Sequence, residues 1–266
     1  MSKKFRIDRS ELPYDAFVSD PTHLSPYEDG PDEKSAYDDF PNQEIKRCSK
    51  DHLKVELISH TMDAAKLCGQ AAAVCTDSRN FESALNHAVG SGHTSVLEHA
   101  SFTFRVQGLS RAALAQLTRH RLASFDVQSQ RYVKLGDWEA VMPETIASSD
   151  FAQEAEDMIL SCMGLYQKML DAGIPAEDAR YVTPQAITTE LVMTMNAREL
   201  LHFFSLRTCN RAQWEIRRLA DEMLTLCKQI EPDIFGNAGP GCVTGQCPEK
   251  KPCGHPRSNE EWEETK

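Results

Sequence analysis

Three arginines, one histidine and two serines gather within the thirteen residues from Arg119 to Arg131, R-H-R-L-A-S-F-D-V-Q-S-Q-R. Guanidinium groups bind phosphate and carboxylate through planar, paired hydrogen bonds, and serine hydroxyls add further donors. The stretch has none of the glycine-rich patterns that bind phosphate through backbone amides. It therefore favours a small anion held by several side chains, although solvated arginines paired with glutamates would give the same charge count.

The charge of the whole chain points in the same direction. With 29 basic and 40 acidic residues the net charge is −11, yet residues 101–132 sum to +4 and residues 179–218 to +3. These two windows hold eleven of the sixteen arginines and no lysine, so that the rest of the chain carries −18. A surface for nucleic acid or for an anionic membrane needs massed lysine and arginine, and the acidic balance excludes both partners.

The composition also indicates where the protein works. No stretch reaches the roughly 20 apolar residues that cross a bilayer, and the N-terminus has no apolar run suited to a signal peptide. We therefore expect a cytoplasmic protein. Its nine cysteines, an odd number without any C-x-x-C pair, indicate reduced thiols or metal ligands rather than a disulfide framework.

The anion-binding residues need a framework of both helices and strands. Alternating apolar residues predict strands at 53–58 and 102–106 and a short strand at 132–135. Helical spacing predicts helices at 61–75, 80–90, 151–172, 175–190, 197–207 and 210–230. The fold class is therefore α+β, with a small antiparallel sheet and several long helices.

A further helix begins at its N-cap Ser110 and continues to about Ser124. Arg119 and Arg121 are two residues apart in it, so about 200° of helix separates their side chains. Both can face one ligand only if the helix ends there and the backbone turns. Ser129 and Arg131 follow in a segment that we expect to be largely loop.

The two ends of the chain differ from its middle. Residues 1–52 show neither helical nor strand period and are expected to form an N-terminal extension, whereas residues 53–235 form the core. Residues 236–266 are a Gly- and Cys-rich tail expected to lie outside that core. Cys242, Cys247, Cys253 and His255 in the tail could bind zinc, but their irregular spacing favours a reduced tail without metal.

The arginine-rich stretch resembles the signature of the flavin-dependent thymidylate synthases, R-H-R-x-x-S-x-x-x-x-S-x-R. Every fixed position is met, by Arg119, His120, Arg121, Ser124, Ser129 and Arg131. The family's longer form usually has an acidic or amide side chain two residues before the second serine, where Val127 stands here. This departure puts one ligand contact in doubt.

Other segments resemble the same family in the same order. His93 to His99 matches its H-x-[ST]-x-x-E-H segment, and Ala179-Arg180 with Pro184 matches its A-R-x-x-x-P element. Asn196 to Arg198 matches N-A-R, which also has the spacing of a helix-capping box with Glu199. Leu206-Arg207 and Ala212 to Ile216 match the late L-R and A-Q-W-E-I pair. The resemblance covers roughly residues 53 to 235 and implies the single catalytic domain of this family.

The resemblance implies an enzyme that makes dTMP from dUMP, with 5,10-methylenetetrahydrofolate as carbon donor and FAD, reduced by NADPH, as hydride source. It implies dUMP-binding positions at Gln116, Arg119, Gln128, Ser129, Gln130, Arg131, Arg180 and Arg207. It implies FAD-binding positions at His93, Ser95, Glu98, Arg119, His120, Arg121, Asn196, Arg198 and His202. It also implies a homotetramer whose active sites are shared between subunits.

Arg207 is the expected catalytic residue. It matches the arginine that the family places at the pyrimidine, where a fixed cation stabilises negative charge developing on the ring. Ser129 is assigned a binding role, because its motif contains no general base other than His120 and a serine nucleophile needs one.

Two alternatives come from other functional classes. A catalytically silent nucleotide- and flavin-binding regulatory protein on the same scaffold would explain Val127 and His202, the latter standing where the family usually has asparagine. A zinc-containing nucleic-acid binder based on the tail is disfavoured, because residues 219–266 sum to −4. Cysteine-dependent thymidylate synthesis is also disfavoured, because no cysteine lies in a stretch that matches the other synthase class.

Overall fold

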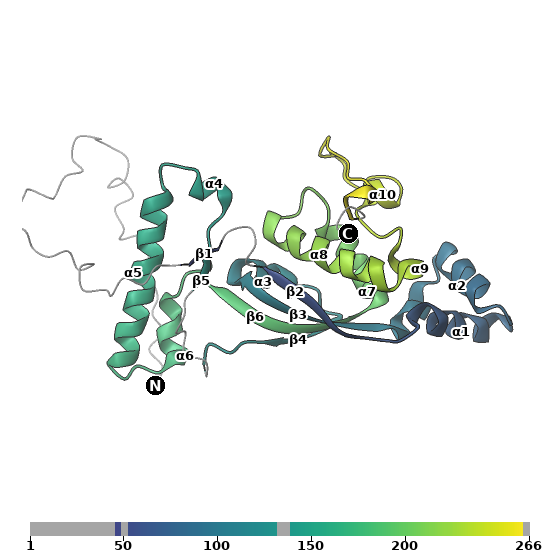
Figure 1. Ribbon diagram of the computed structural model, residues 1–266, viewed down its shortest axis with the longest axis horizontal. Coiled ribbons are helices and arrows are strands. Elements are labelled where there is room, and N and C mark those ends of the chain that lie inside the picture. Colours follow the sequence, from purple (N-terminus) through teal and green to yellow (C-terminus); the bar gives the residue numbers. More distant parts are fainter. Residues whose placement is uncertain (1–45, 49–52, 132–138, 263–266) are drawn as a thin grey trace, which may run out of the picture. The chain divides into compact units, whose positions relative to one another are not determined.

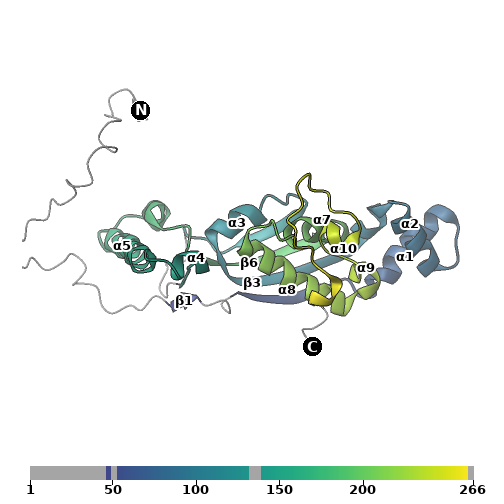
Figure 2. The ribbon, with the colours of Figure 1, turned by 90° about the horizontal axis from the view of Figure 1, so that it is seen from above.

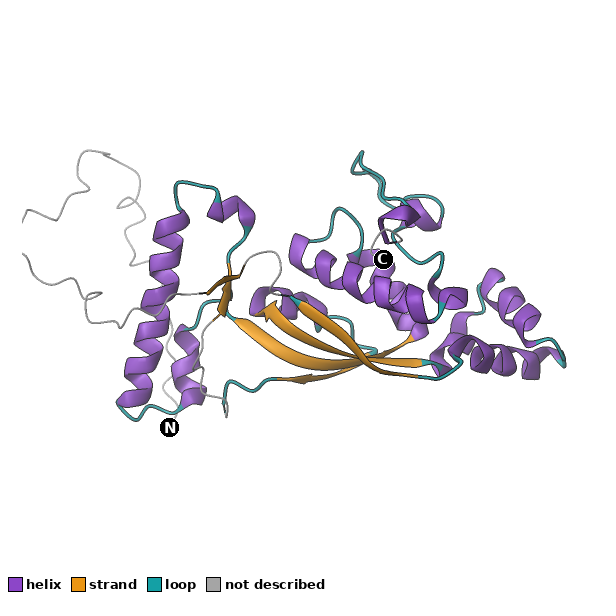
Figure 3. Cartoon of the chain, viewed as in Figure 1, coloured by secondary structure: helices purple, strands orange, loops and turns teal. Residues whose placement is uncertain are grey.

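The computed structural model describes residues 46–48, 53–131 and 139–262. The predicted extension therefore lies almost wholly outside the described residues, and the predicted strand at 132–135 lies outside them entirely. A four-stranded antiparallel sheet organises the described chain in the order β2 (Lys54–His60), β3 (Ser101–Ser110), β6 (Thr188–Asn196) and β4 (Ala123–Val127). Figure 3 shows this sheet with helices around it, which confirms the α+β prediction.

One face of the sheet carries the main core. Phe102, Phe104 and Val106 of β3 are fully buried, as their alternation predicts, and Phe104 pairs in register with Met193 of β6. Three helices contact the sheet: α3 (Arg111–Leu117), α7 (Ala197–Arg207) and α8 (Trp214–Ile230). In Figures 1 and 2, α7 and α8 lie over the same face of the strands.

The segment between β2 and β3 forms α1 (Ala64–Thr76), α2 (Phe81–Gly90) and the 3₁₀ helix η3 (Thr94–His99). Helix α1 starts after Asp63, whose backbone is left-handed and whose side chain caps nothing. The buried Glu231 carboxylate instead accepts hydrogen bonds from the amides of Ala64 (2.9 Å) and Ala65 (3.3 Å). A residue distant in the chain thus satisfies the helix start.

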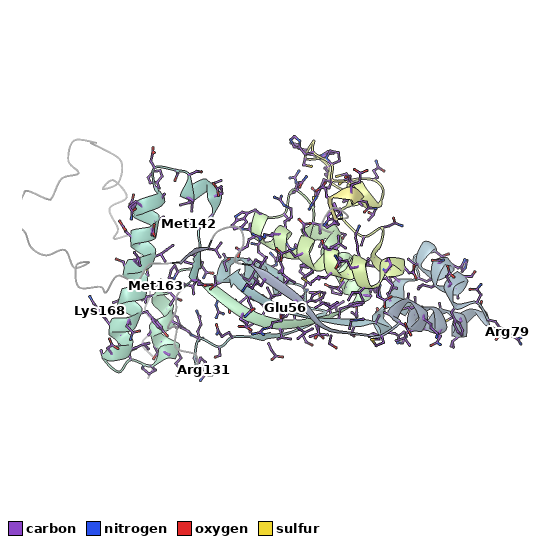
Figure 4. The ribbon with its side chains drawn as sticks, in the orientation of Figure 1. Glu56, Arg79, Arg131, Met142, Met163 and Lys168 are labelled. Atoms are coloured by element: carbon purple, nitrogen blue, oxygen red, sulfur yellow. The ribbon has the colours of Figure 1, made fainter. Side chains whose placement is uncertain are left out.

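A second, smaller apolar cluster lies beside the sheet. It contains Ala140 from β5 (Glu139–Val141), Ile159 and Met163 from α5 (Ala152–Asp171), and Ile187. Strand β5 also pairs in parallel with β1 (Lys46–Cys48). The short elements α4 (Glu144–Ala147), α6 (Ala176–Ala179) and η4 (Arg180–Val182) complete this region, and Figure 4 labels Met142 and Met163 in it.

Two predicted helices are shorter than expected. The helix at 175–190 ends at Ala179, and residues 188–196 form the inner strand β6 instead. The reason is pairing with β3 on one side and β4 on the other, which buries Thr189, Leu191, Met193 and Met195 but not the residues between them. The helix that begins at Ser110 ends at Leu117, and residues 123–127 form β4 rather than loop.

The tail is not wholly outside the core as predicted. Helix α9 (Pro232–Phe235) precedes the tail, which forms α10 (Gly241–Thr244) and η5 (Asn259–Trp262), where the described chain ends. Trp262 is only 5% exposed and belongs to the main core cluster together with Ala238. The end of the tail therefore belongs to the core, because burying the large Trp262 side chain removes much apolar area from water. Among the described residues no helix has the length and apolar character to cross a membrane.

Candidate functional site

The R-H-R triplet sits where α3 stops. Thr118 closes the helix through its amide to Leu114 O, and the amide of His120 returns to Leu117 O at 3.1 Å. His120 is consequently turned into the protein and buried, whereas Arg119 and Arg121 on either side of it are exposed. The helix end that the two arginines require is therefore present.

A buried chain of polar side chains runs from α7 through His120 and back to α7. The Nε of Arg207 donates to His120 Nε2 at 3.1 Å, and His120 Nδ1 lies 3.2 Å from Glu199 Oε1. The His120 and Glu199 side chains are 4% and 9% exposed. The edge of the His120 ring also packs against Phe203, with centroids 5.0 Å apart. The buried His120 and Glu199 side chains thus fix the orientation of Arg207, which is itself half-buried.

The hydrogen bonds assign the protonation state of His120. Because Arg207 Nε can only donate, His120 Nε2 must accept, and the single ring proton must lie on Nδ1, where it is donated to Glu199. Burial lowers the pKa of His120, and the positive charge of Arg207 lowers it further, whereas the hydrogen bond to Glu199 acts in the opposite direction and raises it. His120 is thus a neutral connector between a carboxylate and a guanidinium.

Arg207 is surrounded by more positive than negative charge. Burial, and then the charge of Arg119, lower the pKa of its guanidinium. Its Nη2 donates to the carbonyl of Gln116 at 3.4 Å, and its Nη1 has no partner among the described residues. Two guanidiniums near one another, one of them with a free donor, favour an anionic or electron-rich ligand between them.

A cleft of about 410 Å³ lies along α3. It is lined by Arg111, Leu114, Ala115, Thr118, Gln130, Arg180, Tyr181, Thr183, Pro184 and Gln185. Arg111 Nε and Gln130 Nε2 are buried and have no hydrogen-bond partner among the described residues. Burial, and then the charge of Arg180, lower the pKa of Arg111. Unsatisfied donors and two like charges facing one cleft are the arrangement that an anion would neutralise.

Arg111 is a site residue that the sequence analysis did not single out. It is the first residue of α3, where the positive end of the helix dipole disfavours a cation. The sequence could have indicated it, because an arginine is unusual at the first residue of a helix and residues 101–132 contain no lysine. Its Nη2 donates to Gln128 O at 3.1 Å, which ties the cleft to the end of β4.

The remaining predicted nucleotide-binding residues gather beside α6 and η4. Arg131 Nε donates to Glu177 Oε2 at 2.8 Å, and Arg180 Nε donates to the carbonyl of Glu177 at 3.0 Å. Figure 4 places Arg131 close to α6. The amide of Arg131 donates to Ser129 Oγ at 3.2 Å, which keeps Gln128 to Arg131 in a tight turn.

The predicted flavin-binding residues lie mostly along α7 and η3, which are in contact. Arg198 forms an ion pair with Glu98, and His202, one turn after Arg198, is exposed on the same face and lies edge-on to His120 with centroids 6.0 Å apart. Asn196 is occupied as the N-cap of α7, since its Oδ1 accepts from Glu199 N at 2.9 Å. His93, Ser95 and Arg121 are exposed.

The predicted dUMP positions thus form two groups within one chain. Gln116, Arg119 and Arg207 lie around His120 at the C-terminal end of α3, whereas Gln130 and Arg180 line the cleft, which runs along α3 from Arg111 to Thr118. Val127 belongs to neither group. It pairs in register with Leu191 and packs against the core, because alternation along β4 points it to the buried face.

Two of the tail cysteines make local hydrogen bonds. Cys253 Sγ bonds only within its own turn to His255, and Cys242 Sγ accepts from the amide of Arg257 at 3.4 Å. Within the described parts of the chain, which include all of residues 236–262, no three His, Cys, Asp or Glu side chains are gathered to hold a metal ion. The zinc ligand set considered from sequence is therefore not assembled.

Comparisons with known proteins agree with this geometry. A family model described as thymidylate synthase complementing protein matches residues 56–233. A flavin-dependent thymidylate synthase of Geobacter sulfurreducens is 47% identical over 212 residues, covering 74% of this chain and 91% of that protein. One from Clostridium tetani is 40% identical over 228 residues, again covering 74% and 91%. The crystal structure of the UMP/dUMP methylase PolB from Streptomyces cacaoi, bound with 5-Br dUMP, is similar with a TM-score of 0.60 and 26% identity, covering 69% of this chain and 93% of that one.

Proposed function

Because the chain belongs to the flavin-dependent thymidylate synthase family, we propose that it methylates dUMP to dTMP, taking the carbon from 5,10-methylenetetrahydrofolate and hydride from FAD that NADPH has reduced. The observation that carries the proposal is the buried Glu199–His120–Arg207 chain. It fixes the guanidinium of Arg207, whose Nη1 has no partner among the described residues, and the resemblance to the family assigns this arginine to the pyrimidine. A regulatory protein that only binds nucleotide and flavin would not need Arg207 to be fixed in this way.

The nucleotide phosphate fits the cleft between α3 and η4. A phosphomonoester dianion would accept from Arg111 Nε and Gln130 Nε2 and would offset the repulsion between Arg111 and Arg180. Arg131, with Gln128 and Ser129 beside it, would add contacts at the rim. The phosphate then contributes affinity at a point remote from the reacting ring, which leaves Arg207 for the chemistry.

Arg207 would act on the pyrimidine. As C5 becomes nucleophilic, negative charge develops on the ring, and a guanidinium already desolvated and oriented stabilises it without reorganising. His120 accepts from Arg207 Nε throughout, and Glu199 keeps the His120 proton on Nδ1, so that the imidazole cannot turn its N–H toward Arg207.

FAD fits the exposed face made by Arg119, Arg121, Arg198 and His202. These side chains are donors suited to its diphosphate, and Arg198 is paired with the carboxylate of Glu98. When bound, the flavin supplies the hydride. The protein's part is to hold it beside His93 and Ser95 at the start of η3, next to α7.

The proposal includes a homotetramer with shared active sites, in the cytoplasm. Support comes from the two separate groups of dUMP residues and from apolar side chains exposed beside each of them. Leu122 follows Arg121 and is 72% exposed, and Tyr181 follows Arg180 and is 84% exposed. Large apolar groups next to incomplete binding sites fit contact with other copies of the chain. Light scattering of the purified protein should give the mass of four chains.

Tritium release from 5-labelled dUMP tests the function directly. We expect the purified protein to carry FAD whose absorbance bleaches with NADPH, and to release tritium when methylenetetrahydrofolate is added. A protein that binds flavin and dUMP but releases no tritium would be the regulatory alternative. Omitting methylenetetrahydrofolate provides the matched control.

A further inference from the structure

The C-terminal tail is hydrogen-bonded to the turn that follows Arg207. This tail lies beyond residues 56–233, which the family model matches. We propose that Arg257 in this tail is a positioning residue for Arg207, acting by fixing the end of α7. This inference rests on the proposed function, in which Arg207 faces the pyrimidine. Figure 1 shows the tail running beside α8, close to the connection between α7 and α8.

Arg257 is the centre of the tail's attachment. Its Nη1 lies 2.7 and 2.9 Å from the two carboxylate oxygens of Asp221 on α8, and its Nε donates to Glu261 Oε2 at 2.7 Å. Its side chain is 10% exposed. The same Nη1 donates to the carbonyl of Thr208 at 2.8 Å. One guanidinium therefore joins the tail, α8 and the residue next to Arg207.

Two further contacts hold the same turn. Asn210 Nδ2 donates to the carbonyl of His255 at 2.7 Å, and Arg211 Nη1 donates to the carbonyl of Lys251 at 2.5 Å. Because these partners are backbone carbonyls, their positions depend on the path of the tail. The turn between α7 and α8 is thus fixed by residues 251–257.

Trp262 secures the tail to the core. Its Nε1 donates to Asp221 Oδ1 at 3.2 Å, and its ring lies 4.4 Å below the Arg257 guanidinium and 5.1 Å from Lys228 Nζ. Lys228 also donates to Asn259 Oδ1 at 2.9 Å. A buried indole between two cations makes the attachment specific rather than a loose surface contact.

The effect reaches Arg207 through the helix end. Carbonyls in the last turn of a helix lack partners within that helix, and Thr208 O finds its partner in Arg257. Thr208 is fully buried, and its amide and hydroxyl both bond to Phe204 O. A shift of Thr208 would move the adjacent Arg207 away from its 3.1 Å contact with His120.

Arg257→Lys tests the inference, because lysine can still pair with Asp221 but cannot also reach Thr208 O and Glu261. We expect kcat to fall by about 10- to 100-fold, the cost of a misplaced catalytic group, with KM for dUMP and FAD affinity within about twofold of wild type. Lys250→Ala, an exposed tail residue, is the matched control and should leave kcat unchanged.

A double-mutant cycle separates positioning from general destabilisation. If Arg257 acts through Arg207, Arg257→Lys should have no further effect on kcat in an Arg207→Met background, in which residual turnover is still measurable. Additive losses, or a lower melting temperature with unchanged kcat, would overturn the inference. An inactive wild-type protein would instead refute the proposed function.

Hydrogen exchange provides a readout that needs no turnover. Amides of residues 204–213 should exchange at least about tenfold faster in Arg257→Lys than in wild type or in Lys250→Ala, because the turn loses its partners. Unchanged exchange there would refute the positioning role even if the protein had no synthase activity.

Discussion

Arg207 and Arg111 illustrate two uses of the same side chain. Arg207 is held by His120 and Gln116, and its Nη1 has no partner in the described part of the chain, whereas Arg111 has a buried Nε without a described partner, in a cleft that it shares with Arg180. The first geometry suits a group that acts on charge formed during reaction, and the second suits a permanent anion.

Replacing each arginine by methionine should separate these roles. Arg207→Met is expected to lower kcat by about 10²- to 10³-fold while changing the Kd for dUMP much less, since its work is in the transition state. Arg111→Met should weaken dUMP binding by about tenfold or more, with a smaller change in kcat. Calorimetry with dUMP and tritium release on both variants would decide, with Arg105→Met, an exposed ion pair to Glu190, as control. Equal losses in Kd and kcat for Arg207→Met would reduce it to a binding residue.

His120 predicts a dependence of stability on pH. Its pKa is lowered in the folded protein, so the unfolded chain binds the proton more readily as the pH falls through about 6.5, the ordinary histidine value. The free energy of unfolding should therefore decrease on going from pH 7.5 to pH ~5.5. His120→Gln should reduce this decrease, whereas His99→Gln, at an exposed position, should not. Urea unfolding at both pH values measures it, and an identical pH slope in His120→Gln would contradict the assignment.

At the scale of elements, long-range side chains complete helix ends that their own sequence leaves unfinished. Glu231 lies after α8 but caps α1, and Glu215 of α8 accepts from both the amide (2.7 Å) and the hydroxyl (2.6 Å) of Ser110 at the start of α3. Helix α8 thereby ties two other helices to one position relative to the sheet.

Glu231→Ala should therefore destabilise the fold. Two amides at the start of α1 lose their acceptor, and the expected decrease in the free energy of unfolding is about 1 to 2 kcal/mol, the range for lost helix caps. The same variant should lower the pKa of the buried Cys68 thiol, now about 11, because Glu231 contributes to raising it after burial itself. Chemical denaturation and thiol titration would measure both effects, with the exposed Glu260→Ala as control. An unchanged denaturation midpoint would show that water replaces the carboxylate at no cost.

At the scale of the whole molecule, the two groups of dUMP residues predict complementation between subunits. Arg207→Ala and Arg180→Ala should each be inactive as pure oligomers. Co-expressed in equal amounts they should regain about a quarter of wild-type activity, because in a shared site that fraction receives the intact arginine from each subunit. Mixed oligomers that stay inactive would indicate that both arginines serve the same chain's site.

Local patterns in the sequence were sufficient for much of this protein. The alternation at 102–106 and the N-caps at Ser110 and Asn196 appear where the spacing predicts them, because each depends on neighbours within a few residues. Of the predicted capping box at Asn196 only this N-cap is observed, because the Glu199 carboxylate is bonded to the distant His120 instead. The motif from Arg119 to Arg131, read together with the other matched segments, also identified the family that the comparisons show.

Tertiary structure decided the rest. Residues 188–196 became the inner strand β6 because β3 and β4 pair on both sides, a contact that no local window contains. Arg111 became a site residue because Arg180 faces the same cleft, and Trp262 entered the core because Asp221, Arg257 and Lys228 surround it. Sequence spacing records which side chains are available, but burial and pairing between distant segments determine which of them are left to bind a ligand.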